Sequence, residues 1–267
     1  MKQGAEGFRR RFLRLARAVL ALPETTANSV RFGVIFILPR WFRMPARVNV
    51  AGRSIPLRFL DEEGVDADFI ACFLRNTHGL GRRLGQVRTI VDVGANAGFF
   101  SLAARDFYSR ATIHAYEPNP RILPLLCANV ADLDVHVHPE AVGGADGLVT
   151  LVDVGPSDQA RTRVSDRGDG AVPQAGIATV VERMGGAVDL LKLDCEGAEW
   201  EILTPNDCWK AVRDIRLEYH LFDGQTVEQA RKALAGIGFK IIHLREHSAM
   251  AGVIWAAREQ AALDSSK

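Results

Sequence analysis

The chain has 267 residues, 48% of them hydrophobic, and no sustained low-complexity tract, so it is long enough to bury the core of one large α/β domain. Its formal net charge of +1 creates no overall field that would attract nucleic acid, and it has no zinc-ligand spacing and no RNA-binding signature. Its four cysteines are scattered and form no C-x-x-C pair, as is usual in a reducing compartment. Composition therefore disfavours a nucleic-acid-binding protein and predicts a cytoplasmic globular one.

The first 45 residues are expected to form a basic helical extension. Within them, arginines alternate with apolar residues at roughly helical spacing, over Phe8, Arg9, Arg10, Arg11, Phe12, Leu13, Arg14, Leu15, Arg17 and Leu20. Two interpretations stay open: a helix that packs its leucines on the domain, or one that attaches peripherally to an anionic membrane face. The apolar run Val34–Leu38 ends at Pro39 and is too short for the roughly 20 residues of a membrane span. We therefore expect no transmembrane helix, and Arg17 within the early apolar block argues against a secretory signal.

Residues 46–85 are expected to form a β-hairpin and a helix ahead of the main fold. Two short apolar runs, Val48–Val50 and Ile55–Phe59, flank the turn-forming residues Ala51–Ser54. A short helix is expected near Asp66–Arg75.

From Thr89 onward, strand-like and helix-like segments alternate, which predicts a parallel sheet with helices on both faces. The expected strands are Thr89–Val93, Thr112–Tyr116, Asp134–His138, Asp189–Asp194 and Asp214–His220. The expected helices are Gly98–Tyr108, Arg121–Val130, Ala178–Met184, one beginning near Ala198, and Val227–Ala235. The last two strands, Phe239–Leu244 and Ala251–Ala256, lie too close together for a helix to cross between them, so the final strand must run antiparallel. We expect this domain to span residues 86–260, followed by a tail at 261–267.

An insertion separates the third and fourth strands of this alternation. Leu148–Val152 is expected to be a strand of a local hairpin, because tight-turn glycines precede it. The polar stretch from Gly155 to Gly176 has no periodicity and is expected to be a long loop. Loops of this length are either lids and binding elements or disordered, and both alternatives stay open.

The segment Asp92–Ser101, DVGANAGFFS, predicts a strand that breaks into a glycine turn and opens a helix. Gly94 and Gly98 bracket the turn, where a backbone without Cβ reaches positive φ and lets a ligand approach the main chain. A dinucleotide fingerprint, G-x-G-x-x-G, would place glycines at the third and sixth positions, which here are Asn96 and Phe99. The turn therefore favours a nucleotide-like cofactor and disfavours a nicotinamide-dependent oxidoreductase.

Glu117 follows the second strand of this domain, 19 residues after Gly98. A carboxylate at this offset behind a glycine turn can accept hydrogen bonds from both hydroxyls of a ribose. The alternative is that Glu117 only caps the helix begun by Pro120. We expect the ribose-binding role.

A second segment, DLLKLDCEGAEW, begins at Asp189 and ends the fourth strand. Together with VDVGANAGFFS, YEPNP, AVGGADG and LEYH, it resembles the FkbM family of S-adenosylmethionine (SAM) dependent methyltransferases, whose members methylate hydroxyl oxygens on sugars, lipids or natural products. The resemblance covers about Val91–His220. Two positions depart from the family pattern: Ile177–Thr179 replaces a Leu-Asp-Asp type motif, and Cys195 replaces an aliphatic residue.

The resemblance implies a Rossmann-like class I methyltransferase fold, with a seven-stranded, mainly parallel sheet whose last strand is antiparallel, and SAM as the cofactor. We expect SAM to be bound by Asp92, Gly94, Ala95, Asn96, Gly98, Phe99, Glu117 and Asn119. Asp92 could accept a hydrogen bond from the methionyl ammonium, directly or through water, with structural capping as the alternative. The expected partner is a small-molecule or glycan acceptor with a hydroxyl on a saccharide, glycolipid or secondary metabolite.

Methyl transfer to an alcohol is faster when a base takes the hydroxyl proton, because an alcohol holds this proton tightly. Asp194, Glu196 and His220 follow or end the fourth and fifth strands, and Asp194 or His220 is the expected base. Lys192 shares a strand face with Asp194, which predicts an ion pair that holds this carboxylate. The alternative is a buried salt-bridge cluster that merely orders the sheet edge. Glu199 is expected in the first turn of a helix, as an acid that complements the helix dipole.

Two further questions stay open at this point. Mixed carboxylate and imidazole ligation by Asp194, Glu196 and His220 suits several divalent ions, but the spacing demands none, and we expect no metal. Two alternatives to an O-methyltransferase stay open. One is a non-catalytic SAM-binding module, and the less favoured one is a nicotinamide-dependent oxidoreductase.

Overall fold

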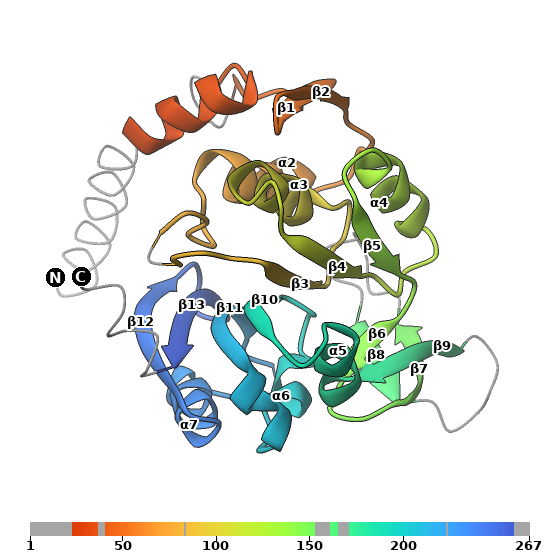
Figure 1. Ribbon diagram of the computed structural model, residues 1–267, viewed down its shortest axis with the longest axis vertical. Coiled ribbons are helices and arrows are strands. Elements are labelled where there is room, and N and C mark those ends of the chain that lie inside the picture. The colour runs from red at the N-terminus through yellow and green to blue at the C-terminus, as the bar shows by residue number, and fades with distance from the viewer. Residues whose placement is uncertain are drawn as a thin grey trace, which may run out of the picture.

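The structure is a computed structural model that describes residues 23–36, 41–82, 84–152, 161–164, 171–222 and 224–258 (Figure 1). The basic segment expected at the N-terminus and the tail at 261–267 lie outside these residues. Among the described residues, no helix is both long enough and apolar enough to cross a membrane.

The central sheet has seven strands in the order β12-β13-β11-β10-β3-β4-β5. Their bounds are β3 (Thr89–Val93), β4 (Thr112–Tyr116), β5 (Val135–His138), β10 (Val188–Leu193), β11 (Val212–His220), β12 (Phe239–Glu246) and β13 (Ala251–Arg258). Neighbours from β11 to β5 pair in parallel, whereas β13 pairs antiparallel with both β11 and β12. The structure thus confirms the class I methyltransferase arrangement, including the reversed last strand.

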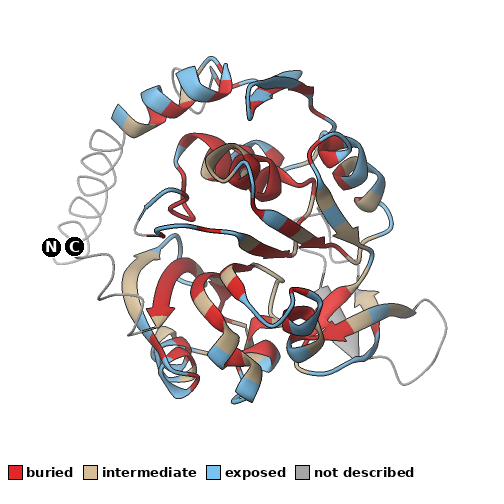
Figure 2. Ribbon diagram, in the orientation of Figure 1, coloured by how far each residue is buried: buried red, intermediate tan, exposed pale blue. Residues whose placement is uncertain are grey.

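Helices cover both faces of this sheet, as the alternation predicted (Figures 1 and 2). Their bounds are α2 (Val65–Phe69), continued by a π-helical turn (Ile70–Leu74), α3 (Phe99–Phe107), α4 (Leu123–Val130), α5 (Ile177–Arg183), α6 (Glu199–Ile202), a 3-10 turn (Asp207–Ala211) and α7 (Val227–Gly236). Ile90 packs with α2 and α3 on one face, and its neighbour Val91 packs with α5 and α7 on the other. Successive residues of β3 therefore point to opposite cores, which is the signature of a doubly covered parallel strand.

The segment ahead of the main fold packs on the same core as α3. The expected hairpin is present, with strands β1 (Arg47–Val50) and β2 (Arg53–Pro56) paired antiparallel, but its second strand begins two residues before the expected Ile55–Phe59 and ends at Pro56. Phe32, at the end of a helix over residues 23–32, is fully buried, and its ring meets Phe73 edge-on with 4.9 Å between centroids. The described part of the expected N-terminal extension is therefore part of the domain's hydrophobic core.

The expectation of a long loop between Gly155 and Gly176 is wrong for its described residues. A second sheet, in the order β6-β9-β7-β8, lies beside α5 and contains β6 (Ala141–Gly143), β7 (Gly147–Val152), β8 (Arg161–Val164) and β9 (Ala171–Gly176). β7 is a strand as expected, but the turn glycines ahead of it do not close a hairpin, because β6 pairs with β9 and β7 pairs antiparallel with β8 and β9, which follow it. β8 and β9 owe their conformation to backbone pairing with β7 and not to a hydrophobic alternation of their own, so the sequence pattern did not reveal these two strands.

Candidate functional site

The glycine turn after β3 is tied to the ends of the neighbouring strands. The backbone N–H groups of Gly94 and Ala95 both donate to the carbonyl of Tyr116 at the end of β4, at 3.1 and 3.0 Å. Asn96 adopts a φ of +48°, and its N–H donates to the carboxylate of Glu117 at 2.8 Å. The turn is thus held in place by the chain itself before α3 begins.

Gly94 is required by the packing of two strand ends. Its φ is +70°, and a Cβ at this position would lie 1.7 Å from the carbonyl oxygen of Asp194, which follows β10. We expected the missing side chain to let a ligand approach, but in the structure the chain fills this space. Gly98 is similar, because a Cβ there would lie 2.8 Å from the side chain of Leu126. Both glycines bring the turn close to its neighbours, and contact with a cofactor stays a prediction for them.

Glu117 has the position expected of a ribose-binding acid. It is 7% exposed, and its two carboxylate oxygens accept the N–H groups of Asn96 and Asn119, at 2.8 and 2.9 Å. Burial raises the pKa of Glu117, and these two hydrogen bonds act in the opposite direction. An ionised carboxylate has about four acceptor positions, so about two remain for hydroxyl groups. The carboxylate is held rigidly and keeps acceptor capacity.

Asp92 is fully buried and engaged by the protein. It accepts a hydrogen bond from the Ser101 hydroxyl at 2.7 Å, and the Lys192 ammonium lies 3.2 Å from its other oxygen. It therefore fixes the start of α3 to the end of β3, which is the structural role weighed against cofactor binding. A direct bond to a methionyl ammonium stays a prediction.

Lys192 contacts both the glycine turn after β3 and the residue that follows β10. The expected pair with Asp194 is present at 3.4 Å, but the ammonium also donates to the Gly94 carbonyl at 2.6 Å and pairs with Asp92. Lys192 is 3% exposed, and although burial alone would lower its pKa, the carboxylates of Asp92 and Asp194 raise the pKa above its usual value. The ammonium therefore stays charged and neutralises acids that would otherwise repel one another.

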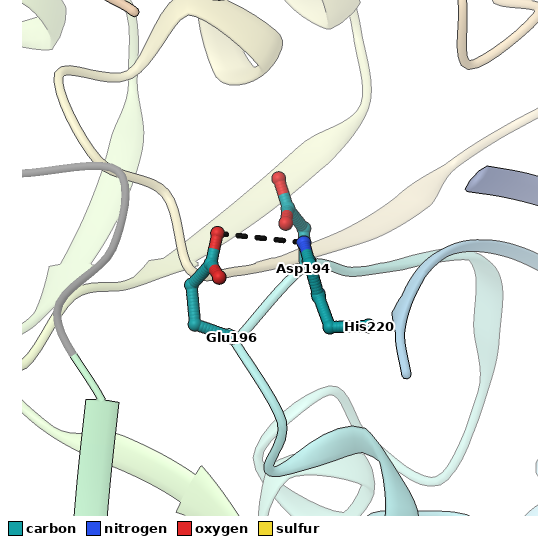
Figure 3. Close-up of side chains that lie close together, drawn as sticks. All are labelled: Asp194, Glu196 and His220. Carbon is teal, nitrogen blue, oxygen red and sulfur yellow. Dashed lines mark ion pairs between the residues drawn. The ribbon is translucent and has the colours of Figure 1, made fainter. Parts of the chain in front are cut away.

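The structure brings together the three expected acid–base residues at the ends of β10 and β11 (Figure 3). Each of Asp194, Glu196 and His220 has a ligand-type atom within 4.8 Å of those of the other two. The Nε2 atom of His220 lies 3.5 Å from a carboxylate oxygen of Glu196. Burial raises the pKa of Glu196 to about 8, with His220 opposing and Asp194 adding to the shift. For His220, burial lowers the pKa, but the hydrogen bond and charge of Glu199 outweigh it and raise the pKa to about 9.

Glu199 has a larger part in the site than the sequence predicted. It does lie in the first turn of α6, yet its side chain turns inward and is 1% exposed. Its carboxylate accepts the N–H groups of Cys195 and Gly197, at 3.0 and 2.7 Å, and lies 3.1 Å from Nδ1 of His220. One buried carboxylate thus fixes both the loop that carries Glu196 and the imidazole that faces it. The sequence signal was its place two residues after Gly197, within the segment DLLKLDCEGAEW that carries the family resemblance.

Asp68 on α2 is a second residue that sequence reasoning missed. Burial raises its pKa to about 7, Lys192 acts to lower the pKa, and Asp194 acts to raise it. α2 packs in the same hydrophobic core as Ile90 of β3 and Leu190 of β10, which brings Asp68 within reach of these two charges. No sequence pattern links a residue ahead of the main fold to this site, so only the folded chain reveals it.

The other two expected cofactor residues on the turn have buried side chains. Phe99 is 2% exposed and meets the rings of Phe69 and Phe73, with centroids 5.5 and 6.2 Å away. Ala95 is 3% exposed and packs with Leu126 on the inner side of α4. Their side chains belong to the core, so a cofactor contact from these positions has to come from the backbone.

Comparison with known proteins shows the family of this chain. The family model described as the methyltransferase FkbM domain matches residues 92–241, more than half of the chain. The chain is 28% identical over 211 residues to the 31-O-demethyl-FK506 methyltransferase FkbM of Streptomyces tacrolimicus, an alignment that covers 64% of this chain and 78% of that protein. It is 30% identical over 168 residues to the methyltransferase sdnD of Sordaria araneosa, which covers 48% of this chain and 65% of that one.

Solved structures with a similar fold include two methyltransferases at low sequence identity. One is the magnesium protoporphyrin IX methyltransferase of Synechocystis PCC 6803 with bound SAM, at 12% identity and a TM-score of 0.42, over 66% of this chain and 72% of that one. The other is an O-methyltransferase family protein from Burkholderia thailandensis, at 12% identity and a TM-score of 0.42, over 68% of this chain and 54% of that one.

The close approach of Gly94 to the Asp194 carbonyl predicts that a side chain at position 94 destabilises the fold. Gly94→Ala should lower the free energy of unfolding by about 3–5 kcal/mol, because the new methyl group overlaps the Asp194 carbonyl and alanine disfavours a positive φ. Gly185→Ala is the matched control, since Gly185 has a φ of +74° and nothing lies within 4 Å of the added Cβ. It should lose only about 1–2 kcal/mol. Urea unfolding followed by circular dichroism measures both, and equal losses would contradict the packing role of Gly94.

Proposed function

Because the chain belongs to the FkbM methyltransferase family, we propose that it is a SAM-dependent O-methyltransferase that acts on a hydroxyl of a saccharide, glycolipid or secondary metabolite. The observation that carries this proposal is the position of Asp194, Glu196 and His220, which lie next to the glycine turn at the carboxyl ends of adjacent parallel strands. Ligands of open α/β sheets bind at these ends. The relative from Streptomyces tacrolimicus, whose name describes an O-methylation, supports the choice of oxygen as the acceptor atom.

The residues around the turn fit SAM. Glu117 offers a rigid carboxylate with spare acceptor positions for the ribose hydroxyls, and the turn from Gly94 to Gly98 lies beside it. When bound, SAM supplies a methyl group on a positively charged sulfur, which makes that carbon electrophilic. The protein's task is then to align the acceptor and to take its proton.

The acid–base residues suit that task. Asp194 is held by Lys192 at 3.4 Å, so its carboxylate has a defined orientation at the end of β10. His220 is held through Nδ1 by Glu199, which leaves Nε2 directed toward Asp194 and Glu196. An acceptor hydroxyl that binds between these groups loses its proton to Asp194 as its oxygen takes the methyl group, and the electron pair of the broken carbon–sulfur bond stays on sulfur. His220, with its pKa raised to about 9, is not the base at neutral pH and positions the acceptor instead.

The ribose assignment of Glu117 is tested by binding. Glu117→Ala should weaken SAM binding by about 10- to 100-fold, because hydrogen bonds to a charged acceptor contribute about 1.5–3 kcal/mol. Isothermal titration calorimetry measures the dissociation constant, and circular dichroism confirms that the variant is folded. The control is Glu228→Gln, an exposed acid in the first turn of α7, which should bind SAM as the wild type does. An unchanged dissociation constant for Glu117→Ala would contradict the assignment.

The O-methylation itself is tested with methyl-labelled SAM and a pool of glycans, glycolipids and small metabolites as acceptors. We expect the wild type to transfer label to a product that resists mild alkali, as a methyl ether does and a methyl ester does not. Asp194→Asn and His220→Ala should each lower the transfer rate by about 100-fold or more. Both should keep SAM binding close to that of the wild type, because the side chains that change pair with Lys192 and Glu199 and not with Glu117.

Alkali-labile label, or label on nitrogen or carbon, would contradict the choice of a hydroxyl acceptor. Variants that bind SAM and transfer label at the wild-type rate would remove Asp194 and His220 from the chemistry. A wild type that binds SAM but transfers label to none of the acceptors would favour the alternative of a non-catalytic SAM-binding module.

A further inference from the structure

Three side chains of complementary chemistry converge where β10 and β11 end (Figure 3). Asp194 follows β10, Glu196 lies on the loop after it, and His220 is the last residue of β11. Their potential ligand atoms, two carboxylate oxygens and one imidazole nitrogen, all lie within 4.8 Å of one another. Atoms that bind one metal ion at about 2.0–2.2 Å are separated by distances of this order or shorter, so small side-chain movements suffice.

The orientation of His220 is an independent observation that points to a ligand. The residue is 8% exposed, and its Nδ1 lies 3.1 Å from the buried carboxylate of Glu199. Its ring stacks on Phe222 with an interplanar angle of 7°, and its carbonyl accepts a hydrogen bond from the indole of Trp200. These contacts leave Nε2 directed toward Asp194 and Glu196. In metal-bound histidines, the N–H group of the ring nitrogen that does not bind the metal characteristically donates a hydrogen bond to a carboxylate in this way.

The loop that carries Glu196 is also fixed around this point. Glu196 adopts a φ of +52°, and the following Gly197 a φ of +109°. Glu199 accepts the N–H groups on either side of Glu196, those of Cys195 and Gly197. The same buried carboxylate therefore positions two of the three converging side chains, so the group is preorganised.

We propose that Asp194, Glu196 and His220 bind one divalent cation, which holds the acceptor hydroxyl beside the cofactor. The proposal rests on the O-methyltransferase function and adds a cofactor to it. Two carboxylate oxygens with one imidazole nitrogen suit Mn²⁺ or Zn²⁺ better than Mg²⁺, which prefers oxygen ligands alone. Three protein ligands leave coordination positions for substrate oxygens, and a bound cation makes a hydroxyl easier to deprotonate.

Mn²⁺ binding to the full-length protein tests the proposal. After treatment with EDTA and its removal, Mn²⁺ is titrated in, and the loss of the free-ion electron paramagnetic resonance signal gives stoichiometry and dissociation constant. We expect one site in the wild type, and binding at least about tenfold weaker in Glu196→Gln and in His220→Asn. The bound ion should show coupling to a nitrogen nucleus in the wild type and in Glu196→Gln, but not in His220→Asn.

Glu218→Gln is the matched control for diffuse attraction by negative charge. Glu218 lies two residues before His220 on β11 and pairs with His247 at 3.7 Å, so the variant removes the same charge nearby without removing a proposed ligand. It should bind Mn²⁺ within about threefold of the wild type, because only a nearby charge changes. The proposal is overturned if the wild type binds no Mn²⁺, if nitrogen coupling is absent, or if Glu218→Gln weakens binding as much as Glu196→Gln does.

Failure of this proposal is distinguishable from failure of the proposed function. SAM binding and label transfer are measured in EDTA and again after Mn²⁺ or Zn²⁺ is added, and we expect transfer to rise with the metal while SAM affinity stays the same. Undiminished label transfer in EDTA would contradict the proposed cation site and leave the proposed methyltransferase function standing. Saturable Mn²⁺ binding in a protein that takes up no SAM would support the cation site and contradict the proposed function.

Discussion

The arrangement of this site depends on one buried ammonium group. Lys192 projects from β10 and contacts the Gly94 carbonyl, Asp92 and Asp194, with almost no access to solvent. Without it, two carboxylates and a carbonyl oxygen would face one another in a region of low dielectric constant. The ammonium makes their close approach favourable, and so the glycine turn and the end of β10 lie in contact.

The close contact between these two strand ends unites the residues proposed to bind the cofactor with those proposed for acid–base chemistry. Glu117 is positioned by the turn, through the N–H of Asn96, and Asp194 by the strand that carries Lys192. Glu199 has a comparable role at the ends of β10 and β11, because its single buried carboxylate holds both the loop of Glu196 and the ring of His220. The functional groups are thus oriented by buried charged groups that are themselves paired, which is how a fold keeps a polar site rigid.

The sequence predicted those parts of the molecule whose conformation is set by local pattern. β3 and β4 match the expected strands residue for residue, since short apolar runs bounded by turn residues form buried parallel strands. β8 and β9 were missed because pairing with β7 determines them. The proximity of Asp194, Glu196 and His220 followed from topology, whereas the inward turn of Glu199, the approach of Asp68 and the burial of Phe99 in an aromatic core arise from tertiary packing.

The most direct test of this account is a double-mutant cycle between Lys192 and Asp92, read by urea unfolding. Lys192→Met alone should cost about 3–5 kcal/mol, because it leaves buried carboxylates unpaired. Asp92→Asn should cost clearly less in the Lys192→Met background than in the wild type, with an interaction energy of at least about 1 kcal/mol. If the two losses add to within about 0.5 kcal/mol, Lys192 does not hold the turn and the strand end together.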